Sequence, residues 1–158
     1  MDLVQVGATW LHLVATVALI GYYEILGLLV IPALRKTVPA REVAASVVAV
    51  EGRALPMIFG SLAIFLATGV FLMANDARYG GVGDVSGSTW ATLLLVKHVV
   101  VLAMVGLGVY IDALVARRFA GPEAIDQAAP VQRLEIAAGV MTLLGAVVLL
   151  LTAYAQAS

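Results

Sequence analysis

The sequence contains no cysteine, and this absence removes several kinds of chemistry at once. Without a thiolate the chain can form no disulfide, iron–sulfur cluster, cysteine-ligated zinc site or thiol nucleophile. A metal site would have to use histidine, methionine, carboxylate or backbone ligands. There is also no Ser/His/Asp order, no glycine-rich phosphate loop and no HExxH pattern, so nothing supports a hydrolase or a nucleotide-binding protein.

Charged residues are scarce as well. They make up 12% of the chain and the formal net charge is −1, so no basic surface is available for nucleic acid and we expect no such partner. In contrast, 63% of the 158 residues are hydrophobic and the mean hydropathy is +1.06, far above the range of water-soluble domains. The expected environment is therefore a lipid bilayer.

Four apolar blocks are each long enough to cross the roughly 30 Å hydrocarbon core as a helix. They cover about residues 4–34, 54–74, 89–116 and 134–154. The amphipathic stretch from Arg41 to Gly52 either lies at the membrane interface or extends the second helix. We predict an all-α membrane protein, with residues 1–158 forming a single transmembrane domain folded as a four-transmembrane-helix antiparallel bundle.

Basic residues indicate the orientation of this bundle. The second connection carries only Arg78, whereas the first and third are flanked by Arg35, Lys36, Arg41, Arg53, Arg117, Arg118 and Arg133. Because cytoplasmic loops are enriched in Lys and Arg, we expect both termini to be non-cytoplasmic. Aromatic residues at the opposite interface agree with this orientation, and they are Trp10, Tyr79, Trp90 and Tyr154. The predicted location is the inner (plasma) membrane.

Titratable side chains inside the apolar blocks are the candidates for function, because burial in hydrocarbon costs several kcal/mol unless the group finds a partner. They are His12, Glu24, Lys97, His98 and Asp112. His12, Lys97 and His98 all lie roughly 12 Å inside the outer boundary, so they could share a ligand. In the alternative, structural interpretation, His12 bonds a neighbouring carbonyl or threonine, and Lys97 reaches the interface or pairs with a carboxylate.

The functional interpretation has two forms. Imidazoles from facing helices are the usual axial pair of a haem b, so His12, His98 and Lys97 are predicted to bind haem in the outer half of the bundle. Such a protein would carry out electron transfer or porphyrin-linked redox chemistry. Copper is the competing ligand, because thioethers and imidazoles suit Cu(I), and its predicted ligands are His12, His98, Met73 and Met104.

Two further expectations concern the rest of the chain. Near the cytoplasmic ends, ion pairing is predicted between the acidic residues Glu24, Asp112 and Glu135 and the basic residues Arg53, Arg117 and Arg133. A third possible function is a cofactor-free accessory subunit of a larger membrane complex. The small size of the chain favours a homo-oligomer or such a complex.

An ordered set of short motifs resembles two related families. The motifs are Trp10-Leu11-His12 on the way to Pro32, Arg53, Thr68-Gly69, Leu95-Val96-Lys97 and Gln132 to Gly139. Together they are similar to the copper resistance D family and to the HemJ-type protoporphyrinogen oxidase family. The resemblance implies a four-helix membrane module that handles haem or copper, with His12 and Lys97 at the functional positions of the HemJ-type pattern. The segment around Glu135 is more similar to the copper resistance family, and Tyr110 stands where the HemJ-type pattern has a further histidine.

Overall fold

The computed structural model describes residues 2–81, 88–119 and 128–157, and within these residues it is helical without any strand. Four helical segments are long and apolar enough to cross a membrane, namely Leu3–Thr37, Ala40–Ala74, Thr89–Arg117 and Ala128–Ala157. This confirms the predicted all-α class with four membrane-spanning helices. The protein is therefore a multi-pass membrane protein whose surroundings are lipid.

The first span contains three helical elements in one continuous rod. They are α1 (Leu3–Glu24), the π-helical turn η1 (Ile25–Val30) and α2 (Ile31–Thr37). Asp2 caps the start, because its side chain accepts a hydrogen bond from the Val4 N–H at 3.0 Å. Pro32 explains the wider turn before it, since a proline nitrogen cannot donate the usual bond to the carbonyl four residues earlier.

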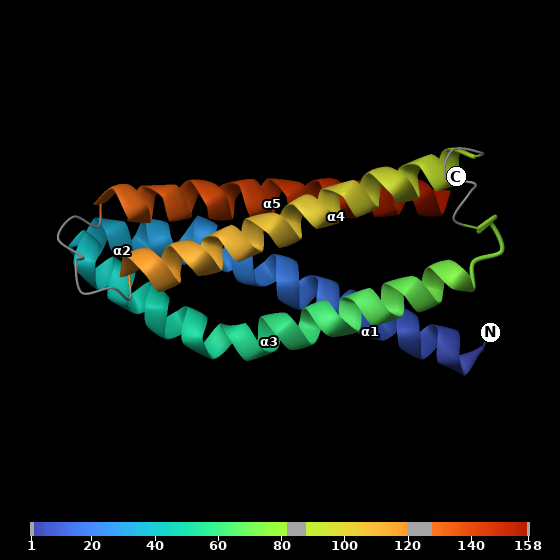
Figure 1. Cartoon of the computed structure of the whole chain (residues 1–158), viewed down its shortest axis with the longest axis horizontal. Coiled ribbons are helices and arrows are strands. Elements are labelled where there is room, and N and C mark those ends of the chain that lie inside the picture. The colour runs from blue at the N-terminus through green and yellow to red at the C-terminus, as the bar shows by residue number, and fades with distance from the viewer. Residues whose placement is uncertain (1, 82–87, 120–127, 158) are drawn as a thin grey trace.

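The second span, α3 (Ala40–Ala74), begins directly after Pro39. The amphipathic stretch from Arg41 to Gly52 is part of it, so this stretch extends the second helix. Pro56 lies inside α3, and Figure 1 shows that the helix is bent. The bend brings the two halves of α3 against different neighbours.

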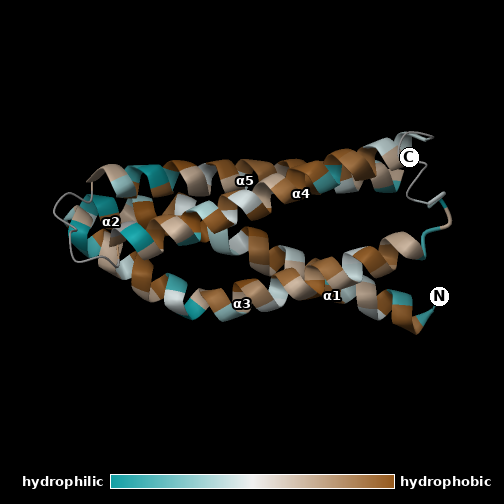
Figure 2. Ribbon diagram, in the orientation of Figure 1, coloured by the Kyte–Doolittle hydropathy of each residue, from teal (hydrophilic) through white to brown (hydrophobic). Residues whose placement is uncertain are grey.

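The remaining spans are α4 (Thr89–Leu114), which continues into the π-helical turn η2 (Val115–Phe119), and α5 (Ala128–Ala157). Both termini lie at one end of the bundle, which we call the terminal end (Figure 1). The opposite end, which we call the basic end, includes α2 and the start of α3. Hydrophobic residues cover most of the helix length, and hydrophilic ones gather at the basic end (Figure 2).

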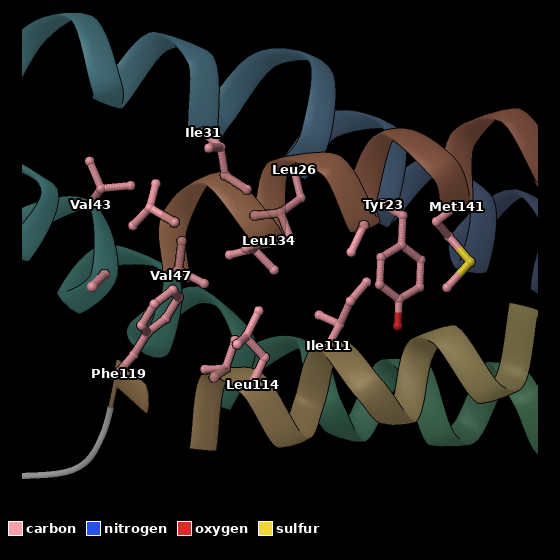
Figure 3. Close-up of a cluster of buried hydrophobic side chains, with 14 residues drawn as sticks. Tyr23, Leu26, Ile31, Val43, Val47, Ile111, Leu114, Phe119, Leu134 and Met141 are labelled. Carbon is pink, nitrogen blue, oxygen red and sulfur yellow. The ribbon is translucent and has the colours of Figure 1, made fainter. Parts of the chain in front are cut away.

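The helices pack closely at the basic end and separate into two pairs toward the terminal end. The most extensive contacts join α1 to α3 and α4 to α5, and Figure 1 shows these two pairs diverging. The core lies in the basic half, where Leu26, Ile31, Val43, Ile111 and Leu134 are almost completely buried (Figure 3). The bundle is thus closed by apolar packing at one end.

Ion pairing at the basic end differs from the prediction. Glu135 of α5 pairs with Arg35 of α2, rather than with Arg53, Arg117 or Arg133. Within the described residues Glu24 and Asp112 have no salt bridge. The sequence did not indicate Arg35 as the partner of Glu135, because Arg35 lies at the end of the first span. It is next to the fourth span only in the folded bundle. Its partly exposed pair with Glu135 is expected to add little stability.

At the terminal end, Asp76 accepts hydrogen bonds from the backbone N–H and the guanidinium of Arg78 at 2.9–3.0 Å. These hydrogen bonds hold the pKa of Asp76 below its usual value of 3.8. A lowered carboxyl pKa stabilises the fold at higher pH, and this stabilisation is lost as the pH falls through the folded-state pKa. We therefore expect Asp76→Asn to lower the thermal stability slightly near neutral pH. The difference from the wild type should disappear below pH 3.8, and a constant difference would contradict this explanation.

Candidate functional site

An almost entirely apolar pocket of about 110 Å³ lies between the two helix pairs. All four spans contribute to it. Its walls include Thr16 from α1, Phe65 from α3, Met104 from α4 and Met141 from α5. Asp112 is the acidic residue that lines it, toward the basic end of α4. A pocket between diverging helices is a usual place for a ligand site in a bundle.

His12 of α1 contacts α3 through polar contacts and ring stacking, next to the pocket-lining Phe65. Its Nδ1 lies 2.9 Å from the Thr68 hydroxyl and 3.1 Å from the Phe65 carbonyl oxygen, and its ring stacks on Phe65 at 4.5 Å between centroids. Gly69 leaves space for the ring, because a Cβ there would lie 3.2 Å from Cε1 of His12. These contacts agree with the structural interpretation, but they occupy only Nδ1. Nε2 has no hydrogen-bond partner among the described residues.

Lys97 and His98 have different surroundings although they are neighbours on α4. Lys97 is half-buried and close enough to His12 for an electrostatic interaction, and it has no salt bridge within the described part of the chain. His98 is exposed, and its Nδ1 lies 2.7 Å from the Leu94 carbonyl of its own helix. The structure therefore brings Lys97, but not His98, toward His12.

This arrangement bears on the predicted haem site. The two histidines do not face each other as an axial pair, because His12 is fixed against α3 and His98 lies on the exposed side of α4. Over the described residues no group of three or more His, Asp or Glu residues could hold a metal ion. Haem binding by His12, His98 or Lys97 stays a prediction, without support from the geometry.

The two methionines predicted as copper ligands lie in different places. Met104 lines the pocket as the copper interpretation requires, whereas Met73 lies near the terminal end of α3 and is not among the lining residues. Met141 also lines the pocket and was missed by the sequence analysis. The methyl group of Met141 packs near Gly108 of α4, where a Cβ would lie 3.8 Å away. Met141 could have been found by noting that it lies on the buried stripe of α5.

A second polar feature adjoins the pocket-lining Asp112 and was also missed. Glu51 of α3 is only 3% exposed, and its carboxyl group interacts with that of Asp112. Tyr23 reaches across from α1 toward α4 in Figure 3, where its hydroxyl lies 3.2 Å from a Cβ built at Gly108. The helical periodicity of the sequence could have identified Glu51 as buried, because it falls on the same buried stripe of α3 as Val47 and Ile58.

These features define a class of protein: a small α-helical membrane protein with an apolar, thioether-lined pocket between two helix pairs. A family model described as copper resistance protein D matches residues 53–155, which is more than half of the chain. The chain therefore belongs to the copper resistance protein D family. No curated protein and no solved structure matches it. His12 lies outside the matched residues.

Proposed function

We propose that the protein binds Cu(I) in the pocket between the two helix pairs and passes it through the membrane. The observation that carries this proposal is the pair of thioethers, Met104 from α4 and Met141 from α5, in one pocket, with His12 stacked on the pocket-lining Phe65. Thioether and imidazole are the ligand types that favour Cu(I). Membership of the copper resistance protein D family supports the same metal.

The shape of the bundle supports a direction of entry. The helix pairs diverge toward the terminal end, and the apolar core closes the basic end (Figures 1 and 3). An ion would therefore reach the pocket from the terminal end, passing His12 before the thioethers. If the predicted orientation is correct, this is the non-cytoplasmic side of the inner membrane.

The test is Cu(I) binding by the detergent-purified protein, measured in competition with a coloured Cu(I) chelator. Replacing Met104 and Met141 together by leucine keeps the volume and removes both sulfur atoms, so we expect the affinity to fall by about tenfold or more. The matched control is Met57→Leu, because Met57 is 46% exposed on α3 and does not line this pocket.

Two results would contradict the proposal. One is equal affinity in the control and the double variant, which would place copper elsewhere. The other is an absence of copper binding together with a Soret band in the absorption spectrum of the same sample. That spectrum would instead support the predicted haem site, and His12→Ala would then test whether His12 is a haem ligand.

A further inference from the structure

The carboxyl groups of Glu51 and Asp112 are buried, and neither has a salt bridge among the described residues. Both oxygens of Glu51 and Oδ1 of Asp112 are fully buried, and none has a hydrogen-bond donor among the described residues. Glu51 is the unusual member, because the residue is only 3% exposed and its carboxyl group interacts with the carboxyl group that lines the pocket. Two ionised carboxylates in this position would be strongly unfavourable, since each would lose its hydration and each would repel the other.

Within the part of the chain that the structure describes, no basic side chain interacts with Glu51. The other titratable groups that interact with Glu51 are Tyr22 and Tyr23 from α1. The Tyr22 hydroxyl is itself buried without a partner among the described residues. The neighbouring elements also carry basic residues. Arg35 of α2 is paired with Glu135 of α5, and Arg117 of η2 is exposed. The side chain of Arg118 is not among the described side chains.

A proton shared between the two carboxyl groups would give them a hydrogen bond with each other. Two carboxyl groups can form a hydrogen bond with each other only when one of them carries a proton, because ionised carboxylates are acceptors alone. The pair also lies at one depth: Glu51 and Asp112 are each 23 residues from the helix end at the terminal end, which corresponds to about 35 Å of helix. The two groups therefore lie at one depth, where Asp112 lines the end of the pocket toward the basic end and its neighbour Ile111 belongs to the apolar core.

We propose that Glu51 and Asp112 share one proton at the closed end of the pocket, and that this proton is released when a Cu(I) ion binds. The identity of the cation rests on the proposed function, whereas the shared proton does not. The exchange has a simple electrostatic reason, because one positive charge enters an apolar site as another leaves it. The proton passes to water, which leaves both carboxyl groups ionised, and the metal ion supplies the single positive charge that the proton supplied before.

Infrared spectroscopy tests the shared proton without any metal. Around neutral pH, we expect the wild type to show a protonated carboxyl band that is absent from the Glu51→Gln/Asp112→Asn double variant. Glu42→Gln is the matched control, because Glu42 is an exposed carboxylate in the first turn of the same helix, and it should leave the band unchanged. A wild type without a protonated carboxyl band, or a double variant that keeps it, would overturn the proposal.

Proton release on metal binding tests the exchange. At about pH 8, above the ordinary histidine pKa, an imidazole and two thioethers have no proton to release, so a proton released on Cu(I) binding must come from another group. With saturating Cu(I) and a pH indicator in weak buffer, we expect about one proton per bound copper from the wild type and none from the double variant. Lys97→Leu should keep the release, which excludes the lysine as its source.

The two measurements separate the possible failures. If Cu(I) does not bind at all, both the proposed function and the exchange are wrong, and the infrared band alone decides whether the carboxyl pair holds a proton. If Cu(I) binds and the double variant still releases the proton, only the role of Glu51 and Asp112 in the exchange is wrong.

Discussion

Replacing Gly27 by alanine is expected to destabilise the folded bundle by about 1–3 kcal/mol. Gly27 lies in η1 where the first span crosses α5, and a Cβ there would lie 2.8 Å from Cβ of Ala138 and 3.1 Å from its backbone carbonyl carbon. A backbone atom cannot move aside like the end of a flexible side chain. The methyl group would therefore push the first span away from α5 at the edge of the apolar core.

Gly21 provides the control on the same span. A Cβ at Gly21 meets no atom within 4 Å, so Gly21→Ala should be neutral or stabilise the helix by about 0.5–1 kcal/mol. The measurement is unfolding of the purified variants in mixed micelles, followed by the loss of helical circular dichroism. Equal effects of the two substitutions would show that close approach of the helices at Gly27 does not limit stability.

Hydropathy predicted the spans because lipid imposes a simple rule on the sequence. Each span must be apolar over about 20 residues, and this signal does not depend on which helices are neighbours. The same rule failed to place the start of the second helix, because the stretch from Arg41 to Gly52 is covered by other helices rather than by lipid alone. For this reason the sequence left open whether the stretch with Glu51 lies at the interface or extends the second helix, and the structure shows the extension, with Glu51 among the buried polar residues.

The candidate site was less predictable, since it depends on helix rotation and pairing. Depth alone grouped His12, Lys97 and His98, but contact with a common pocket also requires the right face of each helix. The structure separates His98 from the other two, and it places Met141 of a different helix beside Met104. A sequence pattern gives each helix its own periodicity, but not the angle at which two helices face each other.

Lys97 provides the second large expected effect. Its half-buried side chain lies close enough to His12 for an electrostatic interaction and has no salt bridge among the described residues. An ammonium in this position opposes the entry of another cation, and a repulsion of only about 1.4 kcal/mol weakens binding tenfold. We therefore expect Lys97→Leu, which removes the charge without adding a sulfur ligand, to raise the affinity for Cu(I) by about tenfold or more, which the chelator competition measures directly.

The charge-preserving variant Lys97→Arg separates electrostatics from shape. It should bind Cu(I) as weakly as the wild type, since the positive charge remains. If Lys97→Leu instead bound Cu(I) more weakly, Lys97 would be holding an anionic partner of the metal rather than repelling the metal. With the expected result, Lys97 places a positive charge on the path of the metal ion, and the proposed carboxyl pair places a releasable proton at the closed end. A metal ion would then have to overcome the first and displace the second, so that its entry is slow when the carboxyl pair cannot release the proton.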